Sequence, residues 1–289
     1  MRKSYLFALI SILIWSTLAT ISKLLLNHLN SIYVLCISSF FASIFLLIVC
    51  VLTGRIKIIK NYRIKDYIIT IFIGIPGTFI YYLFYYLGSS YLCASQAFII
   101  NYLWPIMSVI FACIILKESV TYKKIIAIIL SFSGVFFVAG NIFSVPDSGF
   151  LWGVLFCLFA AVSYGLYTVL TQLTNYDKIV SMMFFYLTSF VLSGLILVFI
   201  HNEIRASTLE WIGMAYNGIA VMAIASTTWL FALEGGKTAK ISNLAYITPF
   251  LSLIWTYLVL KEEVSMGSFI GLFLIIIGIV IQLFRVRNK

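Results

Sequence analysis

The sequence predicts an all-α integral membrane protein of ten transmembrane helices, built as two inverted five-helix repeats. Three observations predict this fold class: long apolar runs, basic residues concentrated in alternate loops, and one segment that occurs twice. The two copies, IINYLWPIMSVIFACIILKESV at 99–120 and LAYITPFLSLIWTYLVLKEEV at 244–264, each carry a proline inside an apolar run that ends in Lys-Glu.

The composition excludes an ordinary soluble protein. Of the 289 residues, 63% are hydrophobic and only 10% are charged, and the mean hydropathy is +1.12. A soluble surface needs far more charge than this. The five cysteines lie in apolar runs without metal-binding or redox spacing, so we expect small buried side chains rather than a metal site.

Ten apolar runs have about the length that crosses the hydrocarbon layer of a bilayer. Their connections are short, which leaves no room for an inserted soluble domain. The breaks near Tyr91 and Asp177 are weak, so nine or eleven spans remain alternatives. The predicted spans are 4–26, 31–53, 67–88, 93–116, 122–140, 150–173, 178–200, 209–233, 237–260 and 266–285.

The basic residues predict the orientation. With both termini in the cytoplasm, sixteen of the nineteen Lys and Arg residues fall in inner segments, and only Arg205 and Lys261 fall in outer loops. Lys23 is left inside the first span. Because cytoplasmic loops are enriched in Lys and Arg, we expect a multi-pass protein of the cell inner (plasma) membrane. The net charge of +10 then reflects orientation in the membrane, and we expect no nucleic-acid partner.

The repeat divides the chain into similar halves, which we place at 1–146 and 147–289 and which together form one transport domain. Each half holds five spans, an odd number, so the second half enters the membrane from the opposite side. Inverted repeats of this kind are typical of alternating-access transporters. A shift of 144 positions superposes Tyr102 on Tyr246, Pro105 on Pro249, and Lys117-Glu118 on Lys261-Glu262.

Three short motifs carry a family resemblance: IWST at 14–17, NYLWP at 101–105 and YITP at 246–249. With the repeat and the span count, they resemble the ten-helix EamA-type form of the drug/metabolite transporter (DMT) superfamily, and within it the aromatic amino acid and paraquat exporters. The resemblance implies a central cavity between the halves, the last span of each half outside it, and efflux without ATP hydrolysis. The chain departs from that branch at Tyr164, where a Trp is expected, and in the uncharged segment GSSYLCASQAF.

Nine residues are candidate substrate contacts. Aromatic residues in the middle of a span are not explained by an interfacial belt; they either line a cavity, where they stack on a planar or cationic ligand, or pack helices together. Part of the tyrosine cluster at 81–86 is expected to reach the cavity, and Asn101 and Tyr246 lie beside the helix-breaking prolines. The candidates are Trp15, Lys23, Tyr82, Asn101, Trp104, Tyr164, Tyr167, Trp229 and Tyr246.

Lys23 and two prolines each allow two interpretations. Lys23 either faces the cavity and pairs with a ligand carboxylate, or extends to the outer headgroups. Pro105 and Pro249 each remove one backbone hydrogen bond and free a carbonyl one turn earlier. They are either hinges that flex during transport or fixed bends. The freed carbonyls can meet a ligand, water or a neighbouring side chain.

These features predict a transporter and not an enzyme. No Asp or Glu lies in the middle of a span, which argues against proton exchange at a buried acid. We expect export of amino acids, aromatic ones included, or related metabolites. Transport of planar or quaternary organic cations, as drug efflux or choline-like uptake, is the alternative; a channel, a lipid-handling protein or a membrane enzyme is remote. We expect no catalytic residues, metal or cofactor, and a monomer in contact with lipid, with a dimer as the alternative.

Overall fold

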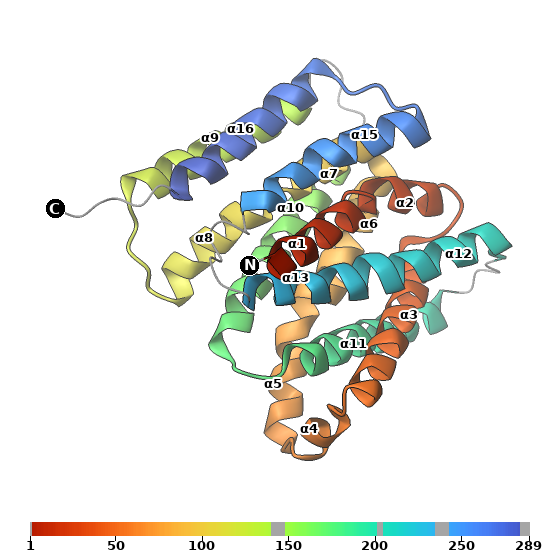
Figure 1. Ribbon diagram of the computed structural model, residues 1–289. Helices are drawn as coiled ribbons and strands as arrows, with labels where there is room; N and C mark the ends of the chain where they lie inside the picture. Colours follow the sequence, from red (N-terminus) through yellow and green to blue (C-terminus); the bar gives the residue numbers. More distant parts are fainter. Residues whose placement is uncertain (1, 140–147, 201–204, 235–242, 284–289) are drawn as a thin grey trace.

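The computed structural model describes residues 2–139, 148–200, 205–234 and 243–283. Within these residues every regular element is a helix (Figure 1), and helices occupy the positions of all ten predicted spans. The predicted fold class is therefore confirmed. The ends of three predicted spans (Gly140, 237–242 and 284–285) lie outside the described residues, as does the predicted boundary between the halves at 146–147.

The first half contains five spans, several of them built from more than one helix. The first span is α1 (Arg2–Trp15) and α2 (Leu18–Leu26), the second is α3 (Ser31–Leu52), the third is α5 (Ile64–Gly74), η1 (Ile75–Ile80) and α6 (Tyr81–Tyr91), the fourth is α7 (Ala94–Asn101) and α8 (Trp104–Ile115), and the fifth is α9 (Tyr122–Ala139). The short α4 (Ile56–Lys60) precedes the third span.

The second half repeats this plan. The sixth span is α10 (Ser148–Leu170) followed by the turn η2 (Thr171–Leu173), the seventh is α11 (Lys178–Phe199), the eighth is α12 (Thr208–Tyr216), η3 (Asn217–Ala225) and α13 (Ser226–Glu234), the ninth is η4 (Asn243–Ile247) and α15 (Thr248–Leu260), and the tenth is α16 (Met266–Leu283).

The helices have the length and surface of membrane spans. Within the described residues, seven helical stretches are long and apolar enough to cross a bilayer, and shorter apolar helices cover Leu244–Leu260 and Met266–Ile281. Large apolar side chains face outward, such as Leu52 and Phe199, which are 80% and 81% exposed. Large exposed apolar side chains of this kind are expected on a surface that contacts lipid rather than water.

The two weak breaks of the sequence prediction are real helix boundaries. Helix α6 ends at Tyr91, and α7 begins at Ala94. Asp177 separates the sixth and seventh spans, and its carboxylate accepts the N–H groups of Ile179 and Val180 at 3.1 and 3.0 Å. This is an N-cap, which satisfies amide groups that have no partner within the helix.

The 144-residue shift also relates local backbone features. Lys117 and Lys261 both end their helices in the left-handed region, at φ 55° and 56°. Helices often end in this conformation, but it is uncommon for residues other than glycine. At the start of the third and eighth spans, Asp66 accepts from the Arg63 N–H at 2.8 Å and Glu210 from the Ser207 N–H at 2.7 Å.

Equivalent helices of the two halves run in opposite directions. Along α9 and α16, Ser131 donates to the carbonyl of Ile275, a Cβ on Gly134 would lie 2.6 Å from the carbonyl oxygen of Gly271, and one on Gly278 would lie 2.6 Å from that of Ala127. Later residues of α9 thus meet earlier residues of α16. The two helices lie side by side at the edge of the bundle (Figure 1), as the family resemblance implied.

The halves are also joined where α3 packs against α11. Ser39 and Ser189 share a hydrogen bond of 3.0 Å in the middle of this pair. At one end, Arg55 forms an ion pair with Asp177 at 3.1 Å, and the Tyr176 hydroxyl donates to Asp66 at 2.8 Å. This hydrogen bond, together with burial, raises the pKa of Tyr176.

Candidate substrate cavity

Five spans are interrupted near the centre of the bundle, among them the fourth and ninth, where the sequence analysis placed the helix-breaking Pro105 and Pro249. The first span breaks at Ser16 and Thr17, whose hydroxyls donate back to the carbonyls of Leu13 and Ile14, both at 2.7 Å. Such bonds compete with the helical pattern. The third and eighth spans contain the π-helical segments η1 and η3. The fourth and ninth spans begin their longer helices with a proline in the first turn.

Side chains near these interruptions surround one internal cavity. Within this cavity, the centre of a water molecule can occupy a volume of about 60 Å³. Both halves contribute to the wall, and nine of the lining residues are aromatic. The lining residues are Trp15, Leu18, Gly77, Thr78, Tyr81, Tyr82, Phe98, Asn101, Tyr102, Trp104, Tyr164, Tyr167, Met182, Tyr186, Ser226, Ala245 and Thr248.

The Tyr164 ring contacts three other aromatic rings of the cavity wall. Its centre lies 4.6 Å from that of Tyr81, 5.1 Å from that of Trp104 and 5.5 Å from that of Tyr167. The Trp104 ring meets it edge-on, at 80°. Rings in tilted and edge-to-face contact present both faces and edges to the enclosed space, which suits a planar ligand.

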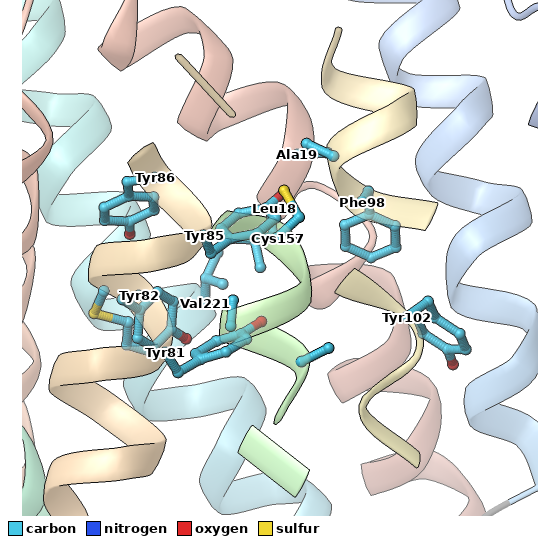
Figure 2. Close-up of a cluster of buried hydrophobic side chains, with 14 of the residues drawn as sticks. Leu18, Ala19, Tyr81, Tyr82, Tyr85, Tyr86, Phe98, Tyr102, Cys157 and Val221 are labelled. Carbon is cyan, nitrogen blue, oxygen red and sulfur yellow. The ribbon is translucent and has the colours of Figure 1, made fainter. Parts of the chain in front are cut away.

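Four tyrosines lie along α6 and divide between cavity and core. Figure 2 shows Tyr81, Tyr82, Tyr85 and Tyr86 on this helix, with Tyr102 on the neighbouring chain segment across the centre. Tyr81 and Tyr82 line the cavity. Tyr85 and Tyr86 are fully buried, and the Tyr86 hydroxyl accepts from the Asn217 side chain at 2.6 Å.

The polar groups of the cavity are neutral, and two of them lack a partner. Asn101 donates to the Tyr81 hydroxyl at 3.0 Å, but its Oδ1 has no hydrogen-bond partner. Thr248 Oγ1 is also without one. Both side chains are 3% exposed. Buried polar atoms are normally satisfied, so these two atoms are available to a ligand or water. No acidic side chain of the described residues lines the cavity.

The comparisons with known proteins agree with a repeated membrane fold. The model of the EamA-like transporter family matches the chain twice, over residues 2–140 and 151–284. The chain belongs to this family. A solved crystal structure with 20% identity superposes with a TM-score of 0.71, covering 98% of this chain and 96% of its own, and this likeness shows the fold.

Similar curated proteins also carry transporter names. An uncharacterized transporter of Archaeoglobus fulgidus is 26% identical over 96% of this chain and 98% of its own length. One of Clostridium kluyveri is 28% identical over 98% and 93%. The aromatic amino acid exporter YddG of Ancylobacter novellus is 24% identical over 62% and 63%. The prediction of a membrane transporter, and not an enzyme, is therefore confirmed.

In this EamA-like transporter, six of the nine candidate contacts line the cavity: Trp15, Tyr82, Asn101, Trp104, Tyr164 and Tyr167. Trp229 and Tyr246 do not. Trp229 packs on Trp15 with ring centres 5.4 Å apart and forms part of the support behind the cavity wall. Tyr246 packs against the hydrophobic core.

In the EamA-like transporter, the Lys23 ammonium group lies outside the cavity, at the end of another span. The Lys23 ammonium group donates to the carbonyl oxygens of Ser89 and Leu92, at 2.9 and 2.7 Å. These carbonyls end α6, where backbone acceptors lack helical partners and a cation is favoured. Lys23 therefore holds the end of the third span and does not line the cavity.

The backbone carbonyl freed by Pro249 accepts a hydrogen bond from a neighbouring side chain, which is one of the partners expected from the sequence. The Tyr102 hydroxyl donates to the carbonyl oxygen of Ala245, four residues before Pro249. A neighbouring side chain from the other half thus replaces the missing N–H. Pro105 lies in the first turn of α8, after the break at Tyr102 and Leu103. Whether either proline flexes stays a prediction.

Several cavity residues of the EamA-like transporter were missed by the sequence analysis. Applying the 144-residue shift to Asn101 and Trp104 leads to Ala245 and Thr248, which both line the cavity. That signal was present but was not used. Met182 and Tyr186 come from the seventh span, where an apolar run gives no indication of which face meets the cavity.

Proposed function

We propose that this transporter moves small organic solutes, above all amino acids and aromatic ones among them, in the export direction. The supporting observation is the aromatic cavity at the point where interrupted helices of both halves meet. Non-helical backbone at membrane depth is tolerated where it lines a cavity, and transporters bind their substrates at such places.

The chemistry of the cavity suits a zwitterion with a planar side chain. Rings such as Trp104 and Tyr164 offer stacking surfaces, while Asn101 Oδ1 and Thr248 Oγ1 offer acceptors for an ammonium group. A zwitterion carries no net charge, so it needs no counter-ion in a wall whose described residues include no carboxylate. The name of the YddG relative points to the same class of solute.

The contacts among the wall aromatics imply movement during transport. The ring centres of Tyr164 and Tyr81 lie 4.6 Å apart, and those of Tyr164 and Trp104 lie 5.1 Å apart. A planar solute that stacks between these rings must therefore move them apart. The helix interruptions beside the cavity, with Pro105 and Pro249 as hinges, provide places where the backbone can bend.

The proposed mechanism is alternating access by two five-helix repeats, 1–146 and 147–289, which form one transport domain. The chain lies in the inner (plasma) membrane with both termini in the cytoplasm and works as a monomer. The described residues of the cavity wall include no carboxylate, and we propose that transport is either uncoupled or coupled through another group. The hydrogen bond from the Tyr102 hydroxyl to the Ala245 carbonyl joins the two repeats beside the cavity. It supports a single transport site to which both repeats contribute.

Organic cations are the alternative solutes, and the nine aromatic rings in the wall favour them. Such rings bind ammonium and planar cations through their negative faces. The neutral wall disfavours them, because a cation entering this space finds no opposite charge among the described lining residues.

Counterflow in proteoliposomes separates these possibilities. Vesicles preloaded with unlabelled phenylalanine, leucine, choline or a planar dication are given the labelled form of the same compound. We expect transient accumulation of phenylalanine above the equilibrium level, less with leucine, and none with the cations. Accumulation of the cations alone would reject the amino acid proposal, and absence of all four would reject both.

A further inference from the structure

The fourth span begins with a helix whose N-terminal cap comes from the other half of the protein. Helix α7 starts at Ala94, and its N-cap residue, Cys93, makes no side-chain cap hydrogen bond. Instead, the Glu262 carboxylate accepts the backbone N–H groups of Ala94 and Ser95, both at 2.9 Å. The Ser95 hydroxyl donates to the same carboxylate.

This contact crosses between the halves at one end of the cavity helices. Glu262 follows α15, the main helix of the ninth span, and α7 is the first part of the fourth span. The first amide groups of a helix have no partner within it and carry partial positive charge, so a carboxylate stabilises them. Separating the fourth and ninth spans at this end would remove the cap.

The equivalent carboxylate at the opposite end of the bundle is arranged differently. Glu118 corresponds to Glu262 under the 144-residue shift, and both follow a lysine with left-handed backbone. Yet the Glu118 side chain is 51% exposed, and its carboxylate binds Lys124 in its own half at 2.9 Å. Among the described residues the two equivalent acids therefore have different partners: Glu262 caps a helix of the other half, and Glu118 pairs with a lysine of its own half.

We propose that Glu262 is a latch that closes the outer face of the transporter while it is docked on α7. The inference rests on the proposed alternating-access transport and on the proposed orientation. In an inverted repeat the two access states exchange the arrangements of the halves. The docked position of Glu262 therefore belongs to the state with the outer side closed, and Glu262 leaves α7 when that side opens.

Accessibility of a cavity cysteine tests the latch without any solute. Ser226 lines the cavity, and Ser226→Cys in a Cys93→Ala background places a thiol there. A membrane-impermeant maleimide is applied to intact cells, with the Cys93→Ala chain as the blank. We expect Glu262→Ala to raise the labelling rate from outside roughly 5- to 30-fold, the population change that loss of a charged cap brings.

The neighbouring acid provides the control. Glu263 is exposed beside the latch, so Glu263→Ala should leave the labelling rate unchanged. A single symmetric peak in size-exclusion chromatography of each purified variant shows that it is folded. Equal rates for Glu262→Ala and its parent, or an equal rise in Glu263→Ala, would overturn the latch.

The labelling result and the transport result can fail separately. If no compound in the counterflow panel is transported but Glu262→Ala raises labelling from outside, the proposed solute is wrong and the latch stands. If phenylalanine is transported while labelling is unchanged, the latch is wrong and the proposed function stands. A rise confined to labelling from the cytoplasmic side would overturn the assignment of Glu262 to the outer face.

Discussion

Replacing Lys23 by methionine separates its structural role from a role in binding solute. The substitution keeps an unbranched apolar stem of similar length and removes the ammonium donor that holds Ser89 and Leu92. Hydrogen bonds to charged groups contribute about 1.5–3 kcal/mol each. The two bonds share one half-buried nitrogen, and water can replace part of their strength. We therefore expect a loss of about 2 kcal/mol in the free energy of unfolding, less than the sum of two bonds.

A thermal shift of the purified protein in detergent measures this loss. For a chain of 289 residues, about 2 kcal/mol corresponds to a decrease in Tm of roughly 3 °C. Lys57→Met is the matched control, because Lys57 is exposed on the short α4, and its Tm should not change. The relative rates for different solutes should be the same in Lys23→Met as in wild type. An unchanged Tm together with selective loss of solutes that carry a carboxylate would refute the structural role and restore Lys23 to the binding site.

Three further predictions test the packing, the cavity and the latch region. A Cβ on Gly165 would lie 2.9 Å from backbone atoms of the fourth span, so Gly165→Val should reduce the yield of folded protein in size-exclusion chromatography severely; a normal yield would mean that the helices are farther apart. Tyr164→Ala should raise the KM for the transported solute about tenfold by removing a stacking surface, whereas Phe159→Ala, on the same helix but 57% exposed, should leave it unchanged. Burial raises the pKa of the Cys93 thiol, and the charge of Glu262 raises it further; Glu262→Gln should therefore move the midpoint of Cys93 alkylation to lower pH, and a shift to higher pH would contradict the contact.

Much of the fold was predictable because a bilayer imposes strong rules on sequence. The length of an apolar run sets the span, and basic loops set the expected orientation. The weak breaks at Tyr91 and Asp177 were visible because short polar or turn-forming groups interrupt the runs. The equivalent prolines, Pro105 and Pro249, indicated where two helices begin again after an interruption.

The candidate site was predicted less completely, because hydropathy does not show which helix faces meet. Trp104 and Tyr164 were found from their depth in the membrane, whereas Tyr186 in an apolar run gave no such signal. Lys23 was misplaced for a related reason. Its partners are backbone carbonyls at the end of another span. Every residue has a backbone carbonyl, so the sequence does not indicate which of them Lys23 contacts.

Protection of the cavity thiol by solute tests most directly whether this cavity is the transport site. Ser226→Cys in the Cys93→Ala background is alkylated by a permeant maleimide in proteoliposomes, with increasing phenylalanine present. We expect phenylalanine to slow alkylation, with half-protection at the concentration that gives half-maximal counterflow. Alkylation at an undiminished rate, at phenylalanine concentrations that saturate transport, would show that the solute does not pass through this cavity.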